Sequence, residues 1–199
     1  MSYLETSEQI LEEIRGDSEL VRKAFEILHD NDQLTPVGAG SKYWYFSVGS
    51  FDSLIHGRLF MGIKISKNAL PEEDYGLASV YSQILVDKFG DKIKGELPLF
   101  YGLLVNKKGS PIATISQDFS EGGKYRVEND NELNPLLDKI FNDERHSLIK
   151  CGIWVNNQRK LVDFNHIHDI RAEYKRTYKE LQDKLKETNL GKIYEPLSI

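Results

Sequence analysis

Apolar and polar positions alternate with different periods along the chain, and each period predicts a different kind of element. From Leu4 to Asp30 apolar residues recur at helical spacing in two blocks, which are separated by Gly16-Asp17-Ser18. This short segment supplies a helix break and an N-cap. We therefore expect two amphipathic helices, and their pattern favours packing on a larger body over an exposed face that binds a partner.

Strand-like runs replace the helical pattern from Leu34 to Ser66. Gly38 and Gly40 lie in a turn between two such runs, where backbone N–H groups can approach a phosphate because no Cβ stands in the way. An ordinary hairpin turn would explain the same two glycines. After a polar turn, Lys64 lies inside the next apolar run. A buried ammonium needs a phosphate or carboxylate partner, whereas an edge strand would let this lysine face solvent.

The following segments alternate between helix and hairpin. Helical spacing returns from Pro71 to about Phe89, with acids near the start of the helix and Gly90 after its last turn. A β-hairpin is predicted from Leu97–Val105 and Pro111–Phe119. A glycine joint at 120–123 then leads to a helix from Asn131 to Phe141.

The stretch from Asn142 to Ile170 carries the candidate chemistry. It contains two apolar runs joined by the polar turn Asn156-Asn157-Gln158, which predicts another β-hairpin, with Asp163 near the end of its second strand. Its spacing matches a kinase catalytic loop followed by the metal-binding Asp-Phe-Gly. However, Ser147 occupies the position of the catalytic aspartate, and Gly152 occupies that of the asparagine that binds a second metal ion.

Composition narrows the class of protein. A chain of 199 residues, 40% hydrophobic and 29% charged, suits one globular unit with a sizeable core. The net charge of −5 gives no basic bias, so we expect no nucleic-acid partner. No apolar run is long enough for a membrane span, and the N-terminus lacks the pattern of a cleavable signal peptide. We expect a cytoplasmic protein, or one secreted by a route without such a signal.

The single cysteine, Cys151, excludes an internal disulfide and fits a reducing compartment. No histidine and acid are arranged around it in the sequence to make it a nucleophile, so we interpret it as an ordinary small residue.

Taken in order, the glycine hairpin, strand lysine, helix, second hairpin, S-L-x-x-x-G-I-W-V and V-D-F-N resemble the protein-kinase-like fold in its minimal bacterial form. The chain is most similar to the YrbL-like family (PhoP regulatory network proteins) and, more distantly, to the short type III secretion effector kinases. The resemblance implies an α+β, two-lobed fold. An N-terminal helical extension (1–33) would precede an N-lobe (34–119) with an antiparallel sheet and one helix, and a reduced, mostly helical C-lobe (120–199) would end in a charged helix at Arg171–Glu187.

The same resemblance implies a nucleotide site. Gly38 and Gly40 would lie over the phosphates, Lys64 would bind the α and β phosphates, and Asp163 would hold Mg²⁺. The adenine hinge would be formed by Gln117, Asp118 and Phe119.

Three of the five chemical groups that phosphoryl transfer needs are replaced. Ser147 cannot orient the acceptor hydroxyl as an acid would, Gly152 offers no side-chain ligand, and Gln83 replaces the helix glutamate that would pair with Lys64. We therefore interpret the chain as a pseudokinase that acts through a protein partner, with at most weak ATP–Mg binding.

Two alternatives remain open on the sequence. In an active atypical kinase, His146, Asp143 or Glu144 would take the place of the missing acid and ATP would phosphorylate a protein or small-molecule hydroxyl. In a small metal-binding protein, Asp163, His166, His168 and Asp169 would hold a transition metal. Histidines at the surface without a metal are commoner than such a site.

Overall fold

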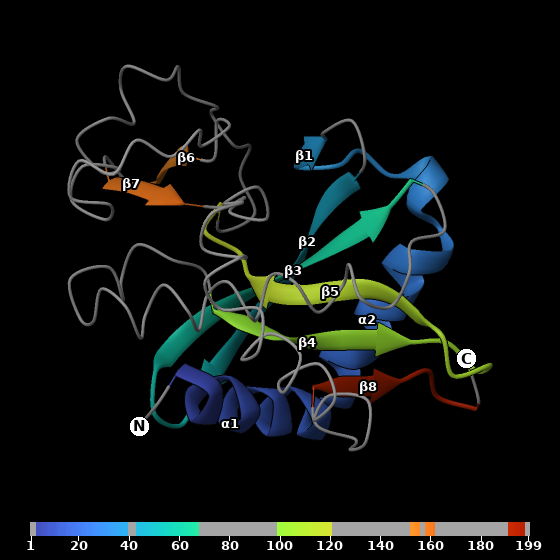
Figure 1. Ribbon diagram of the computed structural model, residues 1–199, viewed down its shortest axis with the longest axis horizontal. Helices are drawn as coiled ribbons and strands as arrows, with labels where there is room; N and C mark the ends of the chain where they lie inside the picture. Colours follow the sequence, from blue (N-terminus) through green and yellow to red (C-terminus); the bar gives the residue numbers. More distant parts are fainter. Residues whose placement is uncertain are drawn as a thin grey trace, which may run out of the picture.

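The structure, a computed structural model, describes residues 3–39, 43–67, 99–120, 152–155, 158–161 and 191–197 (Figure 1). These residues form an α+β arrangement of two α-helices and a mixed six-stranded sheet, with a separate two-stranded hairpin. The predicted helices at 71–89, 131–141 and 171–187 lie outside the described residues. Within the described ranges, no helix has the length and apolar character needed to cross a membrane.

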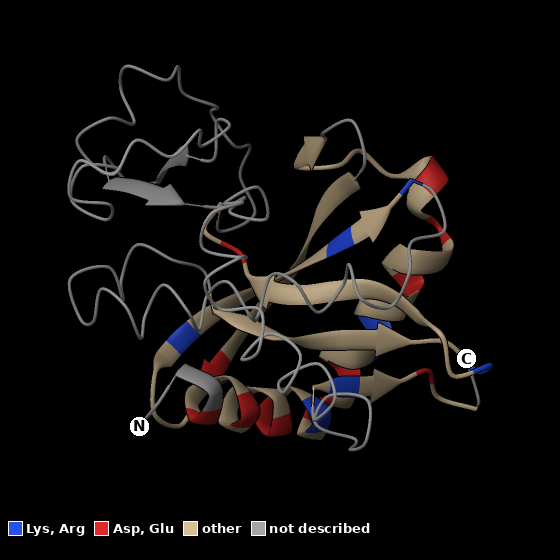
Figure 2. Cartoon of the chain, in the orientation of Figure 1, with Lys and Arg blue, Asp and Glu red and all other residues tan. Residues whose placement is uncertain are grey.

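The two predicted N-terminal helices are confirmed as α1 (Tyr3–Gly16) and α2 (Ser18–His29). The break falls where the sequence indicates, because the Asp17 side chain caps α2 by accepting a hydrogen bond of 3.0 Å from the Leu20 N–H. A short 3₁₀ helix, η1 (Asn31–Gln33), follows. Figure 2 shows acidic residues gathered along α1, away from the apolar positions that pack on the sheet.

The six strands lie in the order β1-β2-β3-β5-β4-β8. Their bounds are β1 (Gly38–Ala39), β2 (Tyr43–Ser53), β3 (Gly57–Ser66), β4 (Phe100–Val105), β5 (Pro111–Gln117) and β8 (Lys192–Tyr194). The hairpin predicted from Leu97–Val105 and Pro111–Phe119 therefore forms as β4 and β5, whereas Gly38, which we assigned to a turn, is the first residue of β1. Strands β3 and β5 come together in the middle of the sheet.

The strands within 34–119 pair antiparallel, as predicted, but the sheet as a whole is mixed, because β8 pairs parallel to β4 with Leu103 opposite Lys192. Residues 192–194 thus belong to the six-stranded sheet and not to a separate helical lobe. The two strands approach closely, with the Leu103 N–H donating to the Gly191 carbonyl at 2.5 Å.

One face of the sheet packs against both helices. Alternate residues of the strands point to this face and join the apolar residues of α1 and α2 in one core, which includes Ile10, Leu11, Ile14, Val21, Phe25, Phe46, Val48, Met61, Ile63, Ile65, Leu104, Ala113 and Ile115. The N-terminal helices are therefore part of the same core as residues 43–117. Lys64 follows Ile63 on β3, so its side chain starts on the opposite face.

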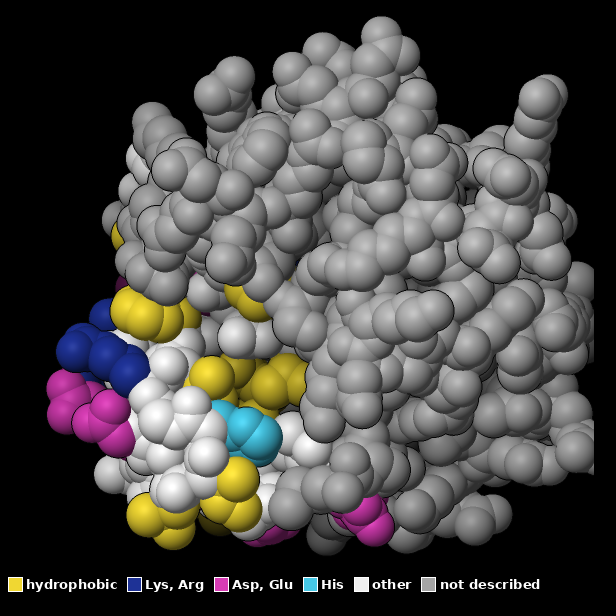
Figure 3. Space-filling model, turned by 90° about the vertical axis from the view of Figure 1, so that its left-hand side faces the viewer, with side chains coloured by type: hydrophobic (Ala, Val, Ile, Leu, Met, Phe, Trp, Pro, Cys, Tyr) yellow, Lys and Arg dark blue, Asp and Glu magenta, His cyan; other side chains and the backbone are white. Residues whose placement is uncertain are grey.

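The turn between β2 and β3 differs from the polar turn that we expected. Strand β2 continues past a bulge at Ser47/Gly49 as far as Ser53, and the turn itself presents Leu54 and Ile55, which are 92% and 51% exposed. The Ser53 hydroxyl accepts hydrogen bonds from the Ile55 and His56 N–H groups, which orders this apolar tip. Figure 3 shows hydrophobic side chains gathered on the side of the molecule that holds the turn.

The hairpin predicted around Asn156-Asn157-Gln158 consists of β6 (Gly152–Val155) and β7 (Gln158–Leu161), with Gly152 opposite Leu161. The first predicted strand is confirmed. Gln158, which we assigned to the turn, already belongs to the second strand, so only Asn156 and Asn157 separate the two.

Candidate functional site

Lys64 lies on an interior strand, because β3 has β2 on one side and β5 on the other. Its backbone is directly opposite Tyr45 and Thr114. The side chain is half-buried, and its Nζ atom lies 4.4 Å from the centroid of the Tyr43 ring. A cation over an aromatic face contributes about 0.5–2 kcal/mol, depending on how far it is desolvated. Because β3 is an interior strand, the alternative that placed Lys64 on an edge strand is wrong.

Gly38 and Lys64 share one row of residues that runs across the sheet. Gly38 of β1 is opposite Tyr45, Tyr45 is opposite Lys64, and Lys64 is opposite Thr114. Since neighbouring strands are about 4.8 Å apart, the backbones of Gly38 and Lys64 are separated by roughly 10 Å. The structure thus brings one of the predicted phosphate-binding glycines near the strand lysine. Gly40 lies outside the described residues.

The predicted hinge begins where β5 ends, and Gln117 is anchored there in three ways. Its N–H donates to the Leu99 carbonyl at 2.7 Å, and its side-chain Oε1 accepts from the Leu99 N–H at 3.2 Å. Its carbonyl accepts a hydrogen bond of 3.3 Å from the Tyr45 hydroxyl. The side chain of Gln117 therefore holds the start of β4, and its carbonyl is engaged by a tyrosine.

Asp118 and Phe119 continue this segment and are both buried. The Asp118 N–H donates to the Phe60 carbonyl at 2.9 Å, while its Oδ1 atom accepts from the N–H and hydroxyl of Ser120. These bonds tie the segment to β3 and close a tight turn. Two backbone groups that could contact a base, the Gln117 carbonyl and the Asp118 N–H, are thus already hydrogen-bonded within the chain.

Tyr45 and Gly62 complete the site, and the sequence analysis did not identify either of them. The Tyr45 side chain lies across Gly62: a Cβ atom built on Gly62 would overlap Tyr45 Oη and Cζ and would lie 3.0 Å from Cε1. Gly62 is a glycine inside an apolar strand, and such a glycine often marks a place where another group approaches closely. That signal was present in the sequence, but the approaching residue could not be identified from it.

Most of the residues that we considered for catalysis or for metal binding, together with Cys151, fall outside the described residues. These are Gln83, Asp143, Glu144, His146, Ser147, Cys151, Asp163, His166, His168 and Asp169. Gly152 is described as the first residue of β6. In the part of the chain that the structure describes, no three His, Cys, Asp or Glu side chains come together as a metal site would require.

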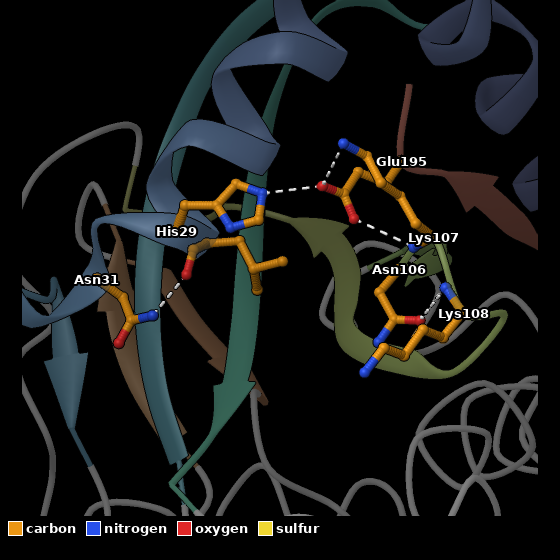
Figure 4. Close-up of polar contacts among 7 residues, drawn as sticks. His29, Asn31, Asn106, Lys107, Lys108 and Glu195 are labelled. Carbon is orange, nitrogen blue, oxygen red and sulfur yellow. Dashed lines mark hydrogen bonds and ion pairs between the residues drawn. The ribbon is translucent and has the colours of Figure 1, made fainter. Parts of the chain in front are cut away.

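A polar cluster of His29, Lys107 and Glu195 links the end of α2, the β4–β5 turn and the segment after β8 (Figure 4). The Glu195 carboxylate, 8% exposed, lies 3.1 Å from His29 Nε2 at the end of α2 and accepts a 3.1 Å hydrogen bond from the Lys107 N–H in the β4–β5 turn. Burial alone would raise the pKa of the Glu195 carboxyl. The hydrogen bonds from Lys107 and His29 and the charges of these two residues outweigh it, so the pKa lies below its usual value of 4.5.

A hollow of about 530 Å³ lies between the start of α2 and β8, and its lining includes Arg15, Ser18, Lys192 and Tyr194. The Arg15 guanidinium donates from Nε to the Lys192 carbonyl at 3.1 Å and also bonds Glu12. This hollow is at the β8 edge of the sheet, opposite the β1 edge near Lys64. It is therefore separate from the predicted nucleotide site.

Comparison with known proteins gives no match: no protein-family model, no curated protein and no solved structure is significantly similar to this chain. The site must accordingly be interpreted from its own geometry. That geometry places the half-buried Lys64, the short strand β1 with Gly38, and the hydrogen-bonded end of β5 on one sheet.

Proposed function

We propose that this chain is a pseudokinase, which acts through interaction with a protein partner and binds ATP–Mg weakly at most. The observation that carries the proposal is the row Gly38, Tyr45, Lys64 across β1, β2 and β3. Protein kinases place a glycine-rich loop over the phosphates and a lysine on the third strand. The same two features lie about 10 Å apart on this sheet, by the spacing of neighbouring strands.

The order of the remaining strands supports the same proposal. β5 lies directly beside β3, so the segment Gln117–Phe119 begins one strand away from the lysine. In the nucleotide site that the resemblance implies, this segment would bind the base while Lys64 binds the phosphates. Between β3 and β4 in the sequence, the segment from Pro71 to about Phe89 has the helical pattern expected of the helix that kinases carry at this point.

We expect no phosphate transfer from ATP, because the chemical groups that this reaction needs are replaced in the chain. Phosphoryl transfer is achieved by positioning and charge neutralisation, with an acid at the acceptor hydroxyl and metal ions on the phosphates. Ser147 and Gly152 supply neither an acid nor a metal ligand. A kinase-like chain without these groups retains its surfaces for binding partners, and we propose that these surfaces perform its function.

The first test is thermal unfolding with and without millimolar ATP–Mg. A ligand at 100 times its Kd stabilises a fold by about 2.7 kcal/mol, and one near its Kd by only about 0.4 kcal/mol. We expect a small upward shift in Tm that Lys64→Ala abolishes. Lys67→Ala is the matched control. Lys67 lies three residues after Lys64 and also contacts an aromatic ring, that of Trp44, but its side chain is exposed.

The second test is phosphate transfer from γ-labelled ATP to the chain itself and to general protein acceptors. We expect no labelling above that of a heat-inactivated sample. Labelling that disappears in Lys64→Ala and Asp163→Ala would contradict the proposal and establish the active atypical kinase instead. A partner, once found by cross-linking to the folded chain, should still bind both variants.

A further inference from the structure

The Tyr45 side chain extends from the row of Lys64 to the end of β5. It starts opposite Lys64, passes over Gly62 and ends with its hydroxyl 3.3 Å from the Gln117 carbonyl. The phenol ring therefore spans the space between the strand lysine and the strand end on the face of the sheet away from the N-terminal helices.

Gly62 makes this position possible. It is opposite Ser47 and Ser116, so it lies in the middle of the three strands β2, β3 and β5. A side chain at this position would overlap the hydroxyl end of Tyr45, as the position of an added Cβ shows. The ring can lie against the sheet only because residue 62 has no side chain.

We infer that Tyr45 is a built-in occupant of the base subsite, and that its ring closes this subsite to a planar nucleobase. This inference rests on the proposed function, which assigns the phosphates to Lys64 and the base to the segment after β5. A base lying between those two groups would have to occupy the space that the phenol fills. The Tyr45 hydroxyl also donates a hydrogen bond to the Gln117 carbonyl. An exocyclic amino group of a base would need the same carbonyl as its acceptor.

The ligand class follows from the shape and polarity of the occupant. Removing the half-buried ring of Tyr45 leaves a flat space that the surrounding structure fills only in part, and such spaces take up ligands of matching shape. The space left by the phenol would lie over Gly62 and offer one acceptor, the Gln117 carbonyl that the Tyr45 hydroxyl now binds. It would therefore suit a planar heteroaromatic ring that carries a donor, and adenine is the simplest probe.

The experiment measures binding of adenine and of ATP–Mg by isothermal titration calorimetry to the full chain and to variants at Tyr45. Tyr45→Ala should bind adenine at least tenfold more tightly than the unaltered chain. Tyr45→Phe should show no gain, because it keeps the ring and loses only the hydroxyl. Tyr194→Ala is the matched control, since it removes an exposed tyrosine from the β8 edge.

Tyr45→Val provides a second route if the alanine variant does not fold, because valine keeps a strand-favouring shape while removing the ring. The inference is overturned if either variant is folded by circular dichroism and binds adenine no more tightly than the unaltered chain. It is also overturned if the unaltered chain already binds adenine as tightly as Tyr45→Ala.

A Lys64→Ala substitution in the Tyr45→Ala background separates this inference from the proposed function. If both hold, Tyr45→Ala binds ATP–Mg more tightly than adenine, and the added Lys64→Ala removes that difference. Adenine binding that gains nothing from the phosphates or from Lys64 would support the inference about Tyr45 and contradict the nucleotide site. The unaltered chain could instead bind ATP–Mg in a way that depends on Lys64 and that Tyr45→Ala does not strengthen. That result would support the nucleotide site and contradict the inference about Tyr45.

Discussion

The carboxylate of Glu195 lies 3.1 Å from the imidazole Nε2 atom of His29, although 166 residues separate the two in the sequence. The same carboxylate accepts a hydrogen bond from the Lys107 N–H (Figure 4). One side chain thus fastens the segment after β8 to the end of α2 and to the β4–β5 turn.

This contact predicts a pH-dependent contribution to stability. Because the pKa of Glu195 is lower in the folded chain than its usual 4.5, its ionised form stabilises the fold at higher pH, and that contribution is lost as the pH falls through the folded pKa. Glu195→Gln should have a lower Tm than the unaltered chain at pH 7. The two melting curves should converge as the pH is lowered below 4.5. A constant difference down to pH 3 would contradict the role given to the charge.

Gly102 should not tolerate a side chain. A Cβ atom there would lie 2.6 Å from the Gly191 carbonyl oxygen and 2.9 Å from Leu11 Cδ1, and the carbonyl belongs to backbone that cannot move freely. Gly102→Ala should cost about 1–3 kcal/mol in chemical denaturation. Gly16→Ala is the control, since open space surrounds it, and it should be neutral or slightly stabilising. Equal stability of the two variants would count against the close pairing of β8 with β4.

The cap of α2 should be worth about 1 kcal/mol. Asp17→Ala removes the acceptor of the Leu20 N–H and should lower the free energy of unfolding by about 0.5–2 kcal/mol. Asp17→Ser keeps an acceptor and should recover most of the loss. Urea denaturation of the three proteins measures both effects, and a serine variant as weak as the alanine variant would exclude capping as the cause.

The Tyr45–Gly62 contact can be tested without any ligand. Gly62→Ala should destabilise the chain by about 1–3 kcal/mol, because the new methyl group meets the Tyr45 side chain. In the Tyr45→Ala background the same substitution should cost much less, since the obstructing ring is gone. A double-mutant cycle measured by denaturation gives this coupling directly, and strictly additive effects would show that the two residues do not touch.

The tip of the β2–β3 hairpin should contribute little to stability. Leu54 is 92% exposed, so Leu54→Ser should change the free energy of unfolding by less than about 0.5 kcal/mol. Leu59, on the same hairpin but only 7% exposed, is the contrast: Leu59→Ala should cost about 2–5 kcal/mol. A large loss of stability in Leu54→Ser would mean that the tip packs against the rest of the chain.

The elements that depend on near neighbours could be predicted from the sequence alone. The periodicity of apolar residues predicted α1 and α2, the Gly16–Ser18 segment predicted the break between them, and the turn at Asn106–Ser110 predicted the β4–β5 hairpin. Each of these signals comes from residues within a few positions of one another, where hydrogen bonding and side-chain direction repeat with a fixed period.

Only the tertiary structure decided which strands are neighbours and which side chains come into contact on the face of the sheet. The placement of β3 between β2 and β5 determined that Lys64 is interior, and a sequence cannot distinguish that from an edge strand. Strand β8 has three residues and no periodic pattern, so only its pairing with β4 defines it. Tyr45 and Gly62 are far apart in the chain and meet through strand register. Such contacts depend on long-range pairing across the sheet, whereas sequence periodicity records only the local conformation of each strand.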